Sequence, residues 1–181
     1  LAPSVETETT AIGVDEVPPT GTQEIPVVAI NFSDTSKSYS PSEFQSLLFG
    51  DDPDIATGPG SVTDYYEENS GGQLTLTGDV SGWETADNGE SYYGDGGIGD
   101  GGSPTGAAEL VKEAAQKADD QVDFAQYDND NDCLVDQFAT IHQGGGQEVT
   151  QQTEDIWSHR WSLASGTGSA YATDDSSPEC G

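Results

Sequence analysis

The segment Ile25-Pro-Val-Val-Ala-Ile-Asn-Phe32 is a nearly continuous apolar run in a chain of otherwise polar texture. A short run that is apolar at successive positions is typical of a strand buried on both faces of a sheet. Pro26 is compatible with this assignment because it stands near the start of the strand, where a missing N–H is tolerated. We therefore predict a buried strand over Ile25–Phe32.

Two helices are predicted after this strand from their capping sequences. Ser40-Pro41-Ser42-Glu43 supplies a cap, a proline at the first helical position and a capping box, and Gly50 ends the helix. Ser61 with Asp64 repeats the capping pattern, and the second helix stops at Ser70-Gly71-Gly72.

Further elements follow from periodicity and turn residues. We expect strands at Gln73–Thr77 and, after a turn, at Val80–Trp83, followed by a loop over Gly89–Gly102. Ser103-Pro104 opens a helix whose buried stripe is Ala107, Leu110, Val111, Ala114, Ala115 and Ala118.

The remaining third of the chain mixes loops and strands. After an acidic loop (Asp119–Asp132) we expect strands at Leu134–His142 and Ile156–Trp161, then a loop-like tail after Ser165. Residues 1–21 read as a flexible acidic leader or the end of a pro-segment, and residues 22–181 as the domain. Helices and strands do not alternate regularly, so the predicted class is α+β.

Charge dominates the composition. The 181 residues include 34 acids and 4 lysines and arginines, which gives a net charge of −30. Nucleic acids and anionic membranes would be repelled, and no apolar stretch approaches the roughly 20 residues of a membrane span. Acidic blocks can indicate disorder. Here the acids alternate with aromatic and aliphatic residues, which favours a folded protein from a halophilic or high-calcium habitat.

The segment Asp128-Asn-Asp130-Asn-Asp132-Cys-Leu134-Val-Asp136 carries the most specific motif. Side-chain oxygens recur at positions 1, 3, 5 and 9, and the Leu134 carbonyl is available at position 7. This spacing lets one loop surround a calcium ion with oxygens at about 2.3–2.6 Å. The alternative is an acidic, solvated turn.

Two positions depart from the EF-hand pattern. Position 6, where a sharp turn favours glycine, is Cys133, and position 12, where an EF-hand has glutamate, is Ala139. Cys133 and Cys180 are the two cysteines of the chain and are either free thiols or one disulfide of an exported protein; we predict the disulfide, which would tie the loop to the C-terminal tail. We therefore predict a calcium loop that is not an EF-hand.

The two histidines, His142 and His159, stand 17 residues apart and lack the close spacing of a helical zinc pair. A structural or hydrogen-bonding role is the expectation for both. A Ser-His-Asp triad remains an alternative, although the chain contains no Gly-x-Ser-x-Gly elbow.

Several motifs follow one another in a set order: Ser61-Val-Thr-Asp-Tyr-Tyr-Glu-Glu-Asn-Ser-Gly-Gly72, Leu74-Thr-Leu-Thr-Gly78, Gly82-Trp83, Val122-Asp-Phe-Ala-Gln-Tyr-Asp128, Ile141-His-Gln-Gly144, Glu148 and Asp155-Ile-Trp-Ser-His159. This order resembles the front half of the immune inhibitor A family of metallopeptidases, over about residues 25–181.

The resemblance implies the N-terminal portion of a zincin-like catalytic domain, with the calcium loop as a brace. It also implies a secreted zinc endopeptidase that cleaves proteins or peptides. The family's zinc-binding His-Glu-x-x-His helix follows the Trp-Ser-His segment, and this sequence contains no His-Glu dipeptide. No zinc ligand or catalytic residue is therefore assigned, and the chain alone is expected to be inactive. The rival class is a non-enzymatic calcium-binding module, such as an adhesin or surface-layer segment.

The charge generates a first prediction. Thermal melts from low to molar potassium chloride should show the melting temperature rising with salt, because screening relieves the repulsion among the acids. A melting temperature that stays flat or falls with salt would contradict the halophilic interpretation.

Overall fold

The computed structural model describes residues 19–50, 60–94, 106–158 and 160–176, and the backbone of residues 11–12. Its elements confirm the predicted α+β class. They are β1 (Ala11–Ile12), β2 (Gly21–Asn31), α1 (Pro41–Phe49), α2 (Val62–Ser70), β3 (Leu74–Thr85), α3 (Glu90–Gly94), α4 (Ala107–Ala118), the 3-10 helix η1 (Phe124–Tyr127), β4 (Leu134–Val135), β5 (Ala139–His142), α5 (Gln147–Thr150), α6 (Leu163–Thr167) and β6 (Tyr171–Ala172).

The predicted buried strand is the centre of the larger sheet. β2 lies between β3 and β5, and both neighbours run parallel to it. A smaller sheet has the order β4-β1-β6, in which β1 is parallel to β4 and antiparallel to β6. Ala11–Ile12, within the segment predicted as a leader, therefore pairs with two later parts of the chain.

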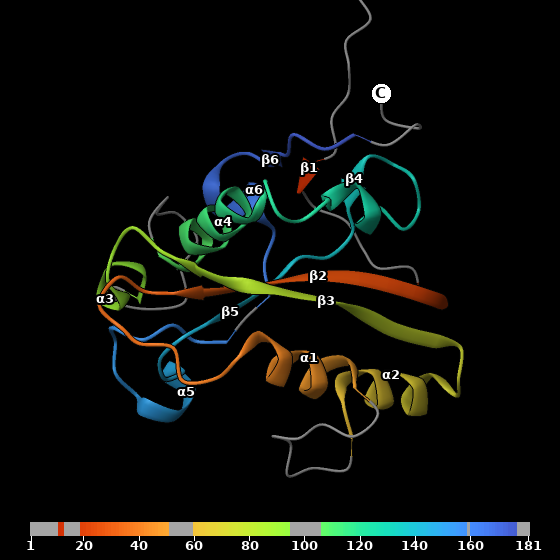
Figure 1. Ribbon diagram of the computed structural model, residues 1–181, viewed down its shortest axis with the longest axis horizontal. Helices are drawn as coiled ribbons and strands as arrows, with labels where there is room; N and C mark the ends of the chain where they lie inside the picture. The colour runs from red at the N-terminus through yellow and green to blue at the C-terminus, as the bar shows by residue number, and fades with distance from the viewer. Residues whose placement is uncertain (1–10, 13–18, 51–59, 95–105, 159, 177–181) are drawn as a thin grey trace, which may run out of the picture.

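Helices cover both faces of the larger sheet, as Figure 1 shows. α4 and the smaller sheet lie on one face, and α1 and α2 lie on the other. Alternate side chains of β2 point to opposite faces of the sheet. Val28 and Ile30 pack in the core beneath α4, whereas Ile25 and Val27 face α1 and α2. Burial on both faces explains why the strand is apolar at successive positions.

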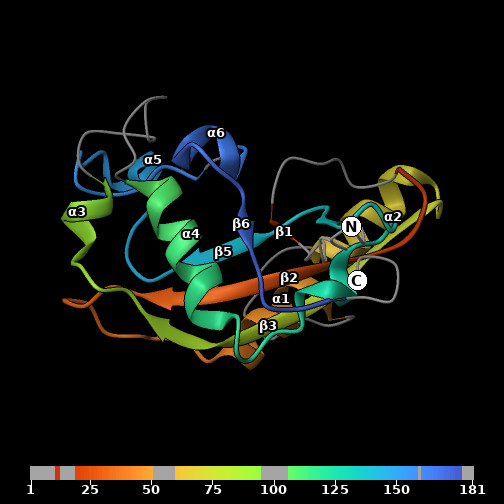
Figure 2. The ribbon, with the colours of Figure 1, turned by 90° about the horizontal axis from the view of Figure 1, so that it is seen from above.

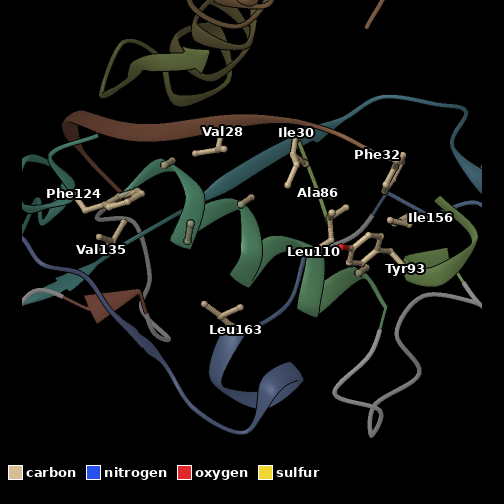
Figure 3. Close-up of a cluster of buried hydrophobic side chains, with 14 of the residues drawn as sticks. Val28, Ile30, Phe32, Ala86, Tyr93, Leu110, Phe124, Val135, Ile156 and Leu163 are labelled. Carbon is tan, nitrogen blue, oxygen red and sulfur yellow. The ribbon is translucent and has the colours of Figure 1, made fainter. Parts of the chain in front are cut away.

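The larger core gathers around α4. Its predicted stripe is confirmed, with Leu110, Ala114, Ala115 and Ala118 at most 2% exposed. Figure 3 shows Leu110 facing Tyr93, with Phe124 and Val135 at the other end of the cluster. α6 packs beside α4 (Figure 2), so closely that a Cβ on Gly166 would lie 2.6 Å from that of Ala108.

Both predicted capping boxes are present. Ser40 caps α1 and Ser61 caps α2, and each hydroxyl accepts a bond from the backbone N–H three residues on. Gly71 ends α2 with φ of 65°. These local signals fixed both helices to the residue because each depends on neighbours within one turn.

The predicted turn between two strands at residues 78–79 is wrong, because β3 runs unbroken from Leu74 to Thr85. Gly78 instead allows the backbones of β3 and β2 to lie close together. A Cβ at this position would lie 1.9 Å from the carbonyl oxygen of Ile25, its partner across the sheet. A register shift opposite Val27–Ala29 follows, where the Ser81 hydroxyl accepts the N–H of Ala29.

Four other expectations are corrected. The strand expected over Leu134–His142 is split into β4 and β5, because the chain changes sheets between them. The described residues of 156–161 form no strand. The loop expected at 89–102 contains α3, and the tail expected after Ser165 contains the last residues of α6 and all of β6. Ser103-Pro104 lies outside the described residues, and α4 has Gly106 at its N-cap.

Two side-chain amides satisfy backbone groups along the larger sheet. Gln45 of α1 donates to the carbonyl of Gly78 and accepts the N–H of Val80, both at 2.7 Å. Asn129 likewise accepts the N–H of Glu24 at 2.9 Å and donates to its carbonyl at 3.1 Å. Each amide takes the place that a further strand would occupy.

Substitution of Gly78 tests the close approach. Gly78→Ala should lower the free energy of unfolding by about 1–3 kcal/mol, since the new methyl group must displace the β2 backbone. Gly82→Ala is the matched control on the same strand, because a Cβ at Gly82 meets nothing within 4 Å. Urea denaturation of both variants measures the difference, and equal stability of the two would refute the explanation.

Candidate functional site

The predicted calcium loop brings three carboxylates together between η1 and β4. Oxygens of Asp128, Asp130 and Asp132 all lie within 4.8 Å of one another. Asp128 is buried at the base of the loop, whereas Asp130 and Asp132 are exposed. Only oxygen ligands are presented, which is the donor chemistry that calcium prefers.

The backbone of the loop curls around the Asp128 carboxylate. Its two oxygens accept the N–H groups of Asp132 and Cys133, each at 3.0 Å. Asn131 and Cys133 have φ of 63° and 74°, in the left-handed region that glycine usually occupies. The sharp turn at position 6 is therefore present without a glycine, at a conformational cost of roughly 1–2 kcal/mol.

Asp136 and Leu134 occupy different places from the three clustered aspartates. Asp136 is 3% exposed, and its Oδ2 accepts bonds from the backbone N–H and the side-chain amide of Asn129, at 2.7 and 2.8 Å. The Leu134 N–H donates to Oδ1 of Asp132 at 2.9 Å. Among the described residues, the group of mutually close carboxylates does not include Asp136.

Asn129 connects this loop to the larger sheet. Its side chain contacts both backbone groups of Glu24 on β2 and also reaches Asp136. Position 2 of the loop thus fastens it to the central strand, while positions 1, 3 and 5 direct carboxylates toward one point. Sequence reasoning missed this role because Asn129 and Glu24 are 105 residues apart.

Cys133 is disulfide-bonded rather than a free thiol. Cys180 lies outside the described residues, so the pairing of these two cysteines stays a prediction. In other loops a glycine adopts this positive φ at little cost. Here the disulfide bond of Cys133 helps to hold the residue in its unfavourable conformation.

His142 ends β5 and has structural contacts. Its ring centroid lies 5.5 Å from that of Phe32, and its Nδ1 lies 3.1 Å from the carbonyl oxygen of Gln143. The Ser158 hydroxyl donates to Glu148 at 2.8 Å rather than to a histidine. His159 lies outside the described residues, so its predicted role is untested.

Carboxylates surround the glycine turn after β5. Bonds from its own backbone N–H and from Ser158, with the nearby charge of His142, lower the pKa of Glu148. Burial, and then the charges of Asp155 and Asp34, raise the pKa of Glu90. Gly144 has φ of 108°, a backbone conformation that residues with a side chain rarely adopt, so this turn favours glycine.

A second acidic group was not foreseen. Oxygens of Asp119, Asp174 and Asp175 lie within 4.8 Å of one another where the end of α4 meets the segment after β6. Asp119 accepts the hydroxyl of Tyr171 and Asp175 accepts the N–H of Phe124, both at 2.7 Å. These bonds give the group a structural role, and no local motif could have predicted it.

Comparison with known proteins relates this chain to a peptidase family. A family model described as immune inhibitor A peptidase M6, catalytic domain, matches residues 23–180. Immune inhibitor A of Bacillus thuringiensis subsp. alesti is 34% identical over 151 residues, covering 71% of this chain and 22% of that protein. The pre-pro-metalloprotease PrtV of Vibrio cholerae serotype O1 is 33% identical over 153 residues, covering 69% and 16%. The chain thus spans less than a quarter of either relative.

Proposed function

This chain belongs to the immune inhibitor A family of M6 peptidases, and from that premise we propose that it forms part of the catalytic domain of a secreted, zinc-dependent metalloendopeptidase braced by calcium. The observation that carries the proposal is the match of the family's catalytic-domain model to residues 23–180. Proteins or peptides are the substrates of such an enzyme.

Zinc, when bound, would polarise the scissile carbonyl and activate a water molecule. A zinc peptidase requires three protein ligands and a carboxylate base. The two histidines of this sequence stand 17 residues apart and belong to no His-x-x-x-His pair. We therefore assign this chain a supporting part, in which it supplies the sheet, the calcium loop and, as the family resemblance implies, a section of the cleft wall at Ile156–Trp161.

Calcium is assigned to Asp128, Asp130 and Asp132, with the Leu134 carbonyl and Asp136 completing the set. Three carboxylates within 4.8 Å repel one another strongly without a counter-charge. A divalent ion would remove that repulsion. It would also order the loop that contains Asn129, whose side chain bonds to Glu24 on β2. Mg²⁺ fits less well, because it demands regular octahedral geometry and retains its waters.

Secretion is supported by two observations. Cys133 is disulfide-bonded, which is usual in oxidising compartments. The relative from Vibrio cholerae is named as a pre-pro-metalloprotease. Within the part of the chain that the structure describes, none of the helices is long and apolar enough to span a membrane.

Calorimetry tests the calcium assignment. Calcium titrated into the metal-free protein should show a site that Asp130→Ala weakens at least tenfold, because a clustered carboxylate is lost. Asp120→Ala is the matched control: it removes an exposed aspartate of the same acidic segment that lies outside the cluster. Equal affinity in the wild type and in Asp130→Ala would exclude these ligands.

Proteolysis tests the peptidase assignment. The 181-residue chain should neither retain stoichiometric zinc nor cleave casein, whereas a longer protein that includes a His-Glu-x-x-His helix should do both. Chelator-sensitive cleavage by the 181-residue chain would overturn the supporting role and direct mutagenesis to His142 and His159. A longer protein that binds calcium but never cleaves protein would favour the non-enzymatic module.

A further inference from the structure

Three aromatic rings line an open groove on the face of the larger sheet that α1 covers. Phe44 on α1 lies between Tyr39 and Trp83, with ring centroids 6.0 Å apart in both pairs and interplanar angles of 74° and 75°. The groove has a volume of about 360 Å³ and is lined by Tyr39, Phe44, Trp83, Ile141, His142, Gln143 and Gly144. It lies at the carboxyl ends of the parallel strands β3 and β5.

Hydrogen bonds hold the segments that carry Tyr39 and Trp83 in place, while Phe44 and Trp83 are half-buried. The indole N–H of Trp83 donates to the carbonyl of Tyr39 at 2.8 Å, and the N–H of Ser38 donates to the Gln143 side chain at 3.1 Å. The Tyr39 side chain nevertheless remains 51% exposed.

A carboxylate is anchored at Ser40, the residue that follows Tyr39. Glu43 precedes Phe44 on α1, and its Oε2 accepts the backbone N–H and the hydroxyl of Ser40, at 2.7 and 2.8 Å. These bonds lower the pKa of Glu43, so the group stays charged at neutral pH. Aromatic rings attract organic cations, and a carboxylate held close to one of them along the chain adds to that attraction.

We propose that this groove binds the arginine side chain of a protein or peptide partner. The guanidinium group is planar, stacks on aromatic faces and pairs with carboxylates, so it suits the aromatic lining of the groove and the Glu43 carboxylate held at Ser40. The volume is near the lower end of ligand pockets, about 300 Å³, which suits a single side chain. A net charge of −30 favours a basic partner over an acidic one. The inference is independent of the proposed peptidase activity, because it uses none of the zinc or calcium chemistry.

Two amides that differ in charge but hardly in shape test the proposal. Nα-acetyl-arginine amide should shift the NMR signal of the Trp83 indole N–H in a saturable way, at constant ionic strength. Nα-acetyl-citrulline amide has almost the same shape without the charge and should leave that signal unmoved. Saturable shifts of equal size with the citrulline compound, or no saturable shift with the arginine compound, would overturn the proposal.

Variants locate the site. Tyr39→Ala should weaken arginine binding about two- to fivefold, as expected for the loss of one exposed cation–π contact. Glu43→Gln should also weaken it, while glutamine preserves the capping box. Tyr65→Ala removes an exposed tyrosine of α2, 61% exposed, and should leave binding unchanged. Circular dichroism checks that each variant is folded, and wild-type affinity in Tyr39→Ala or in Glu43→Gln would contradict the assignment.

Discussion

The side-chain amide of Asn129 joins the carboxylate loop before β4 to the central strand of the larger sheet. It bonds to both backbone groups of Glu24 on the central strand and also to Asp136, directly before the chain passes from β4 to β5. β5 pairs with β2 only from Val27 onward, so the amide satisfies backbone that this strand does not reach. Gln45 does the same for β3 from the other face. The carboxylate loop is thus built into the support of the central strand.

The position of the loop means that repulsion among its carboxylates also affects the contact with β2. Clustered carboxylates in a protein of net charge −30 oppose folding of the loop that contains Asn129. A bound cation would convert that opposition into attraction and would stabilise the left-handed turn at Asn131 and Cys133. In our account the ion stabilises the sheet because it orders the residue that fastens the loop to β2.

The sequence predicted those features whose causes are local. Ser40 and Ser61 cap their helices through contacts within one turn, and the stripe of α4 follows from helical periodicity. The spacing of Asp128, Asp130 and Asp132 predicted that their oxygens would converge.

Features that depend on distant residues were missed or misread. Gly78 resembled a turn residue because its need for glycine arises from Ile25, and the aromatic groove combines segments around Tyr39, Trp83 and Ile141. The run after Ile156 has strand-like composition, but its described residues pair with no strand.

We infer that calcium in the Asp128–Asp136 loop supports β2 through Asn129. Amide hydrogen exchange of Glu24 with calcium and with a chelator tests it most directly, and Val80, whose N–H is bonded to Gln45, serves as the internal reference. We expect the Glu24 amide to be protected with calcium and to exchange faster in chelator, while the Val80 amide changes little. Exchange at Glu24 that is indifferent to calcium, or that changes in step with Val80, would contradict it.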